Sequence, residues 1–174
     1  TIAVKDFVKQ SKIFKHIFRG YKILADLPHK DVAIDPYFLG LWLGDGDSHR
    51  AGITTMDEEI VDYLYQFAKQ EKVGVVISKK SKGRAKSYHL TNGTYKGMPR
   101  KGSNPLYTKL KDYNLISNKH IPDAYLYTDR ESRLQLLAGL IDTDGYLGKP
   151  RKGKKGYSYH VGQADEVLTR QIFQ

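Results

Sequence analysis

Two almost continuously apolar stretches dominate the hydrophobic pattern of the chain, at 38–46 (FLGLWLGDG) and 137–145 (LAGLIDTDG). When aligned, they share a glycine, the leucine after it and a closing Asp-Gly pair: Gly40 and Gly139, Leu41 and Leu140, Asp45-Gly46 and Asp144-Gly145. The chain therefore contains an internal repeat. Because each stretch is apolar nearly all round, we expect two short buried helices, with an interface through Gly40 and Gly139 where the backbones approach closely.

Capping residues support both helices. Asp35-Pro36 supplies an N-cap followed by proline at the first helical position, and Thr128 with Glu131 three residues later forms a capping-box pattern. Gly46 and Gly145 suit a chain that leaves each helix with a positive φ.

The rest of the pattern alternates between short strands and amphipathic helices. One or two short helices with interspersed lysines are expected within 1–30. The other predicted elements are strands at 51–55, 73–78, 88–95 and 157–162, a helix that opens on a Thr55–Glu58 capping box and runs to about 72, a helix that begins at Asn104-Pro105, and a helix over 165–174. This order of elements predicts an α+β fold.

The acidic ends of the two repeats predict a metal site. If the repeat helices pack side by side, Asp45 and Asp144 converge, and two facing carboxylates repel unless a cation lies between them. The negative end of each helix dipole also favours a cation. Mg²⁺ takes carboxylate oxygens in phosphoryl chemistry, and the helix-end carbonyls of Gly44 and Thr143 could add further ligands. The alternative is two unrelated buried helices, each followed by an ordinary Asp-Gly turn.

Composition favours a polyanionic partner. The 174 residues include 29 Lys and Arg against 19 Asp and Glu, which gives a net charge of +10 and a pI near 9.6. Such an excess is typical of proteins that bind nucleic acid or an anionic membrane surface. No apolar run is long enough to span a bilayer and no signal peptide opens the chain, so we expect an intracellular protein without a membrane partner. The lack of cysteine excludes disulfides and thiolate zinc sites.

Two runs of basic residues are candidates for phosphate contacts. One lies between two predicted strands and the other follows the second repeat: Lys79, Lys80, Lys82, Arg84 and Lys86, and Lys149, Arg151, Lys152, Lys154 and Lys155. A charge run is commonly just a solvated loop, and the second run could also be a nuclear localisation signal. Because both runs adjoin predicted strands in a basic protein, we interpret them as contacts to the phosphate backbone of a nucleic acid.

The stretch 137–145 differs from the name sequence of the LAGLIDADG homing endonucleases only at Thr143, while the first stretch keeps Asp45 but has Leu43 at the earlier Asp position. The chain resembles this family from about residue 32 to its end. The resemblance implies an αββαββα half-domain for each motif, a pseudo-twofold axis between the motif helices, and DNA lying across a saddle of β-strands. It also implies that Asp45 and Asp144 bind metal.

A Lys-x-Ile-Pro sequence at 119–122 further resembles the intein-encoded members of the family, which implies a catalytic role for Lys119. An ammonium there could stabilise charge on the scissile phosphate or orient the attacking water; the alternative is an exposed lysine before a rigid Ile-Pro. The resemblance divides the chain into a helical lead segment (1–34), a first half-domain (35–127) and the start of a second half-domain (128–174), which would be incomplete in this chain.

Together these features predict a site-specific endonuclease that cuts both strands of a DNA target with Mg²⁺, for which Mn²⁺ substitutes. Asp45, Asp144 and Lys119 are the expected catalytic residues. If the chain derives from an intein, a host protein is a further partner, and a present second half would make it a pseudo-symmetric monomer. The alternative is a nucleic-acid-binding module on the same scaffold, either an RNA maturase or an inactive DNA binder. A basic structural protein is a third interpretation.

Overall fold

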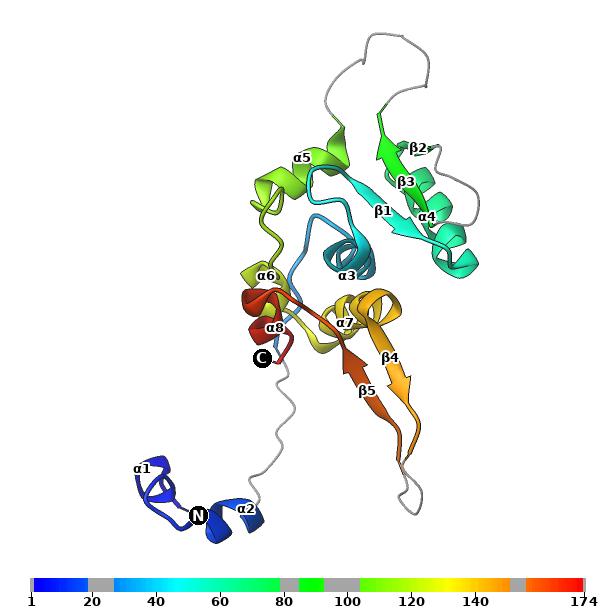
Figure 1. Ribbon diagram of the computed structural model, residues 1–174. Helices are drawn as coiled ribbons and strands as arrows, with labels where there is room; N and C mark the ends of the chain where they lie inside the picture. The colour runs from blue at the N-terminus through cyan, green and yellow to red at the C-terminus, as the bar shows by residue number, and fades with distance from the viewer. Residues whose placement is uncertain (1, 19–26, 79–84, 93–103, 151–155, 174) are drawn as a thin grey trace.

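The computed structural model describes residues 2–18, 27–78, 85–92, 104–150 and 156–173. Its elements are, in order, α1 (Val4–Phe7), α2 (Lys12–Ile17), α3 (Pro36–Asp45), β1 (Gly52–Thr55), α4 (Glu58–Gln70), β2 (Gly74–Ile77), β3 (Lys86–Thr91), α5 (Pro105–Asp112), α6 (Asp123–Leu126), α7 (Arg130–Asp144), β4 (Gly145–Gly148), β5 (Ser158–Val161) and α8 (Glu166–Ile172). Helices occur together with antiparallel sheets, which confirms the predicted α+β class (Figure 1). No helix in the described ranges is long and apolar enough to cross a membrane.

The two helices of the internal repeat, α3 and α7, lie side by side at the centre of the fold (Figure 1). On one side is a three-stranded antiparallel sheet in the order β1-β3-β2, in which Ile53 pairs with Tyr88. On the other side is the β4–β5 hairpin, in which Tyr146 pairs with His160. Antiparallel strands therefore follow each repeat helix.

Helix α3 forms the centre of the core because its side chains are apolar on every face. Seven of its ten residues are buried, and Phe38 stacks on Phe67 of α4 with ring centroids 4.3 Å apart. Asp35 caps the helix as predicted, accepting a hydrogen bond from the amide of Phe38, and Tyr63 donates its hydroxyl to the same carboxylate. The core thus holds the start of α3 in place from two directions.

Helix α7 is less buried than predicted. Its buried residues are confined to one stripe: Ser132, Leu136, Gly139 and Leu140. The expectation of a helix buried all round is wrong for α7 because α3 is covered by both α4 and the β1 side of the sheet, whereas α7 packs chiefly against α3.

Aspartates rather than threonines cap two of the helices, which corrects two predicted capping boxes. Asp129 caps α7 by accepting from the amide of Ser132, and Asp57 caps α4. An ionised carboxylate is a stronger acceptor for helix amides than a hydroxyl. The threonines instead hold the aspartates: Thr128 Oγ1 donates to Asp129, and Thr55 Oγ1 accepts from the amide of Asp57.

The glycines after the repeat helices do not adopt the predicted positive φ. Gly46 has φ −75° and Gly145 has φ −104°, both ordinary extended backbone. Glycine is needed there for space, because a Cβ on Gly46 would overlap the carbonyl oxygen of Trp42, and a Cβ on Gly145 would overlap that of Ile141. Close packing, and not backbone conformation, selects glycine at both positions.

The other elements keep the predicted order but differ at their ends. β1, β2 and β5 are shorter than predicted, α4 ends at Gln70, α8 ends at Ile172, and β3 begins two residues early at Lys86. The pattern missed β4 and α6. β4 follows the repeat helix without a break and contains two glycines among its four residues, so it lacks the run of β-forming residues that marks a strand.

The lead segment contains two short helices, α1 and α2, within the predicted range. Phe7, Phe14 and Phe18 form an aromatic cluster, with Phe7 and Phe18 ring centroids 5.3 Å apart. Ser11 caps α2 by accepting a hydrogen bond from the amide of Phe14.

Two residues of the lead segment bind the start of α7. The amide of Lys30 donates to Thr128 Oγ1, and His29 Nδ1 lies 2.8 Å from Asp129 Oδ2. The hydrogen bond to Asp129 raises the pKa of His29 above its ordinary 6.5, while hydrogen bonds from Ser132 hold the pKa of Asp129 well below its ordinary range. A charged pair therefore joins the lead segment to the second repeat.

We expect His29 to titrate above 6.5 in the folded protein and to return toward its ordinary pKa in Asp129→Asn, because asparagine keeps a good N-cap but removes the charge. The contribution of this pair to the stability of the fold is fully present at pH values below the ordinary pKa of histidine. It is lost as the pH rises through the raised pKa of His29. It is also lost in acid, as the pH falls through the lowered pKa of Asp129. An NMR pH titration of the imidazole measures the shift, and a wild-type pKa equal to that of Asp129→Asn contradicts the contact.

Candidate active site

Glycines make the seam between α3 and α7 possible. A Cβ on Gly40 would overlap the carbonyl oxygen of Leu136 and lie 3.0 Å from the Cα of Gly139. Further along, a Cβ on Gly44 would overlap Thr143 Oγ1. Because these contacts advance together along both helices, α3 and α7 run in the same direction and their C-terminal ends meet.

The two repeat acids, Asp45 and Asp144, lie where these helices end. A Cβ on Gly44 would lie 3.4 Å from the carboxyl carbon of Asp144, so the last turn of α3 contacts that side chain. Burial raises the pKa of each acid, and the charge of Asp45 raises the pKa of Asp144 further, whereas Lys119 lowers both. The seam therefore holds two carboxylates that repel each other.

Lys119 brings an ammonium group to the end of α3. Its Nζ donates to the carbonyl oxygens of Leu43, Gly44 and Gly46 at 3.1, 3.1 and 2.9 Å, respectively. It also lies 5.2 Å from the centroid of the Trp42 ring. A cation is favoured there by the negative end of the α3 dipole and by the face of the indole.

The ammonium group is also surrounded by acids. Burial lowers the pKa of Lys119, whereas the charges of Asp144, Asp45 and Asp47 raise it. One ammonium among three carboxylates leaves the site with a net negative charge when all four groups are ionised. A further cation is therefore electrostatically favoured near the seam.

Gly44 and Thr143, the two residues predicted to offer carbonyl ligands, face each other across the seam. The Thr143 hydroxyl turns back on its own helix and donates to the carbonyl oxygens of Gly139 and Leu140 at 3.0 and 3.2 Å. The carbonyl oxygen of Gly44 already accepts a hydrogen bond from Lys119. Because a carbonyl oxygen has two lone pairs, it retains one acceptor position for a second partner.

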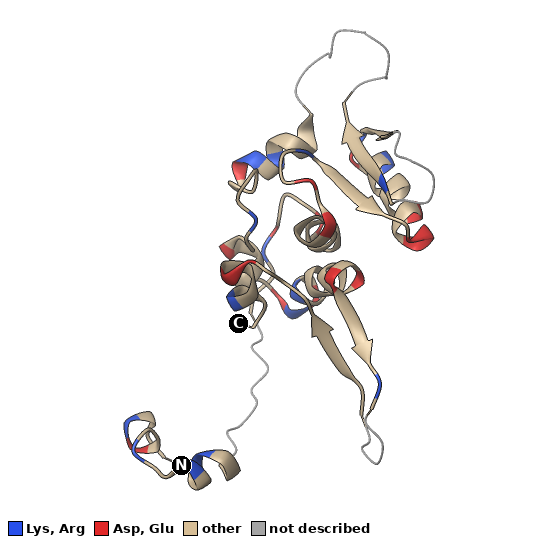
Figure 2. Ribbon diagram, viewed as in Figure 1, with Lys and Arg blue, Asp and Glu red and all other residues tan. Residues whose placement is uncertain are grey.

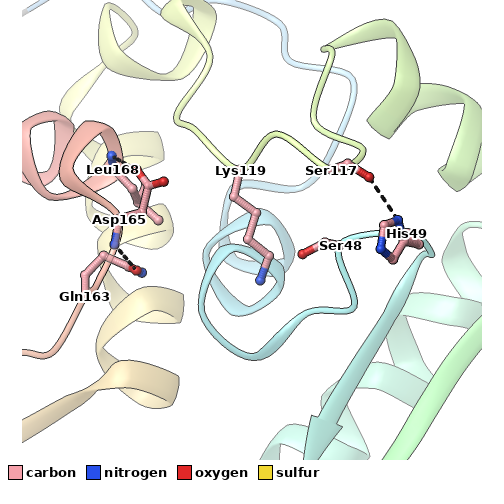
Figure 3. A pocket seen from close by; sticks show the side chains of 7 residues that line it. All are labelled: Ser48, His49, Ser117, Lys119, Gln163, Asp165 and Leu168. Atoms are coloured by element: carbon pink, nitrogen blue, oxygen red, sulfur yellow. Dashed lines mark hydrogen bonds between the residues drawn. The ribbon is translucent and has the colours of Figure 1, made fainter.

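A pocket of about 390 Å³ opens beside Lys119 (Figure 3). It is bounded by the loop after α3, the connection before α6, the turn between β5 and α8, and α8 itself: Ser48, His49, Ser117, Lys119, Gln163, Asp165 and Leu168. Ser117 Oγ and His49 Nδ1 lie 2.9 Å apart on one wall. The segments that follow α3 and α7 therefore both contribute polar groups to one cavity next to the seam.

The predicted basic runs fall largely outside the described residues, where Lys79, Lys80, Lys82, Arg84, Arg151, Lys152, Lys154 and Lys155 lie. Lys86 begins β3, and Lys149 directly follows β4; both are exposed. The described Lys and Arg residues are distributed over many elements and interspersed with acids (Figure 2). A basic face is thus not visible in the described ranges, and the contacts assigned to these runs stay predictions.

Comparisons with known proteins connect the chain to two curated relatives. Over 150 residues it is 32% identical to the homothallic switching endonuclease of Saccharomyces cerevisiae (strain ATCC 204508 / S288c). The aligned region covers 79% of this chain and 25% of that protein. The chain is related to an endonuclease. Over 120 residues it is 35% identical to the replicative DNA helicase DnaB of Mycobacterium intracellulare, which covers 69% of this chain and 16% of that protein.

The chain therefore spans a quarter of the length of one of these relatives and less than a fifth of the other. No family model matches it. The similarity to a nuclease agrees with a site that presents paired carboxylates.

Sequence reasoning missed Gln163, whose Nε2 donates to Asp144 Oδ2 at 3.2 Å. Its Oε1 accepts from the amide of Asp165, which fixes the orientation of the side-chain amide. The internal repeat could have pointed to the position, because Asp57 and Asp165 cap corresponding helices and Gln163 corresponds to Thr55. Because the first copy has threonine where the second has glutamine, comparing the two copies did not indicate a role for Gln163.

Proposed function

We propose that this chain is the nuclease part of a LAGLIDADG homing endonuclease that cuts double-stranded DNA at a specific site. The observation that carries the proposal is the convergence of Asp45 and Asp144 at the ends of two parallel, duplicated helices. The similarity to the homothallic switching endonuclease over 150 residues supports it.

The acid pair fits Mg²⁺, with Mn²⁺ as a substitute. Mg²⁺ is commonly held by one or two carboxylates together with substrate phosphates and waters, and two repelling carboxylates are what the seam presents. In the described ranges, no three His, Cys, Asp or Glu side chains lie close enough to one another to hold a metal ion together. Asp45 and Asp144 would hold the ions, and the carbonyl oxygens of Gly44 and Thr143 would be additional ligands. When bound, such ions neutralise the attacking and leaving oxygens of a phosphodiester.

The surrounding side chains position the phosphate and the acids. Lys119, held at the end of α3, would stabilise negative charge that develops on the scissile phosphate. Gln163 restricts the orientation of the Asp144 carboxylate. The polar pocket beside Lys119 offers space for water and for one DNA phosphate. Lys119 is thus the third proposed catalytic residue.

The β4–β5 hairpin has a polar face suited to base contacts. Tyr146 and His160 are paired across the strands with their rings stacked, centroids 4.7 Å apart, and His160 Nε2 lies 2.8 Å from Ser158 Oγ. Because side chains alternate along a strand, Leu147 and Tyr159 project to the opposite face. Phenol and imidazole groups offer hydrogen-bond donors and acceptors to base edges. The basic residues that follow β4 would contact the phosphates.

We expect Tyr146→Ala and His160→Ala to relax the preference for particular base pairs at adjacent target positions. Each loss of a direct base contact is expected to weaken discrimination by about 1–3 kcal/mol. Leu147→Ala, on the opposite face, is the matched control and should keep the wild-type preference. Cleavage of a library of single-base target variants measures the profile. Wild-type profiles for both polar-face variants contradict this assignment.

We further propose that the chain is derived from an intein. The same chain matches short parts of two proteins with different names, a replicative helicase and a switching endonuclease. Such a distribution suits a segment that is inserted into unrelated host proteins. In this scheme, residues 1–34 are the lead segment, 35–127 the first half-domain and 128–174 the start of the second.

A nucleic-acid-binding module without cleavage activity is the second candidate. One contact favours this function. The ammonium group of Lys119 donates a hydrogen bond to the carbonyl oxygen of Gly44, which is one of the proposed metal ligands. An RNA maturase or an inactive DNA binder could use this ammonium in place of a metal ion.

Selection from a library of randomised DNA duplexes distinguishes the two functions. The protein is incubated with the library and Mg²⁺ or Mn²⁺, and molecules with new ends are captured and sequenced. An endonuclease yields one recurrent sequence cut on both strands. A recovered sequence that is bound but left intact at every metal concentration rejects the nuclease and supports the binding module.

A further inference from the structure

Lys119 lies in the connection between α5 and α6, which has no regular secondary structure at that residue. On one side, the amide of Ser117 donates to the carbonyl oxygen of Ser48 at 2.8 Å. On the other side, Ile121 is buried. Because the lysine side chain is a flexible four-carbon chain, the position of its ammonium group depends on how firmly this backbone is held.

Gln171 of α8 holds Ile121 with a reciprocal pair of hydrogen bonds. The amide of Ile121 donates to Gln171 Oε1 at 2.8 Å, and Gln171 Nε2 donates to the carbonyl oxygen of Ile121 at 3.0 Å. A primary amide carries a donor and an acceptor side by side, so one side chain satisfies both backbone groups of a buried residue. Leu168 of the same helix is buried in the core and seats α8 beside this backbone.

We propose that Gln171 is a positioning residue for Lys119. Helix α8, which follows Asp144 in the sequence, would thereby fix the backbone of Lys119. The ammonium group of this lysine lies at the end of α3. Only His120 separates Ile121 from Lys119, and the three carbonyl contacts of the ammonium group, at 2.9 to 3.1 Å, weaken steeply if that backbone moves. The consequence of this contact for catalysis rests on the proposed nuclease function.

A purely structural role for Gln171 leads to a different expectation. In that case the two hydrogen bonds only stabilise the docking of α8, and their loss acts independently of Lys119. Substitutions that act through the same group are non-additive, whereas independent ones add. The dependence of the Gln171 effect on Lys119 therefore separates the two roles.

Trp42, the single tryptophan of the sequence, reports the position of Lys119 directly. Lys119→Met removes the cation above the indole ring and is expected to change its fluorescence emission. We expect Gln171→Met to shift the emission in the same direction, and to cause no further shift when combined with Lys119→Met. Gln171→Glu keeps the acceptor for the Ile121 amide but places a carboxylate oxygen against the carbonyl oxygen of Ile121, so it should shift the emission in the same direction as Gln171→Met.

Single-turnover DNA cleavage gives a second readout. Gln171→Met is expected to slow the cutting step about 10-fold or more, as when groups that support direct ligands are removed, with unchanged affinity for DNA. Combined with Lys119→Met, the same change should slow cutting no further. Arg170→Gln is the matched control on α8, because it breaks only an exposed ion pair with Glu166. It should match the wild type in both readouts.

The emission of Trp42 and the rate of DNA cleavage test different parts of the proposal. If the wild-type protein cuts no DNA, the proposed function is wrong and the emission of Trp42 alone decides the role of Gln171. Wild-type emission in both Gln171→Met and Gln171→Glu overturns the proposal. A cutting defect that adds in full to that of Lys119→Met also overturns it.

Discussion

Asp45→Asn and Asp144→Asn are each expected to lower the rate of DNA cleavage by about a thousandfold or more, because each removes one of the two proposed metal ligands, and a bound ion supplies several kcal/mol of transition-state stabilisation. Both variants should fold at least as stably as the wild type. Burial raises the pKa of both acids, which means that their ionised forms destabilise the ion-free fold, and a neutral asparagine removes this cost. The loss of cleavage therefore cannot come from unfolding.

Single-turnover cleavage and chemical denaturation measure the two halves of this prediction. Asp142→Asn is the matched control from the same motif. Its carboxylate accepts a hydrogen bond from Tyr37 Oη at 2.7 Å, which an asparagine oxygen can also accept, and it should cut at the wild-type rate. Cleavage by Asp45→Asn or Asp144→Asn at the rate of Asp142→Asn would show that the acid pair is not the catalytic centre.

Gly40→Ala and Gly139→Ala are expected to destabilise the fold by about 3 kcal/mol or more, toward the upper end of the range for overpacking a core. The added methyl groups would overlap backbone atoms of the facing helix, which cannot move aside as a side chain can. The helices must then separate, so the acids at their ends move apart and cleavage is lost as well. The free energy of unfolding, from the denaturation midpoint and slope, measures the effect.

Gly74→Ala is the control for these two variants. A Cβ there would meet only the carbonyl oxygen of Thr91 at 3.6 Å, an ordinary contact, so the change should shift stability by less than about 0.5–1 kcal/mol. A wild-type denaturation curve for Gly40→Ala or Gly139→Ala would mean that the close α3–α7 seam does not form.

The centre of the fold could be predicted from the sequence because its signals are local. The apolar repeat predicts α3 and α7, Asp35-Pro36 predicts the start of α3, and short runs between the helices predict β1, β2, β3 and β5. The shared glycines of the repeat also indicate the helix faces that could approach each other. Each of these inferences depends on a pattern within one short stretch or on the similarity of two such stretches.

The parts that were wrong or missed depend on contacts that the residue types in a short stretch do not reveal. Gly46 and Gly145 are glycines because of the space left by the preceding turn, which a local φ argument does not reveal. Gln163 and Gln171 are uncharged residues whose partners lie 19 and 50 positions away, so nothing in their own sequence marks them. The three carbonyl partners of Lys119 likewise depend on how α3 ends.

The proposed nuclease activity requires that Asp45 and Asp144 together bind divalent cations at the seam between the repeat helices. Anomalous diffraction from crystals of the protein soaked in Mn²⁺ tests this most directly. We expect a strong peak about 2.1 Å from a carboxylate oxygen of Asp45 or Asp144, the distance expected for a hard divalent cation. Manganese bound elsewhere, with both carboxylates free of metal, would contradict it.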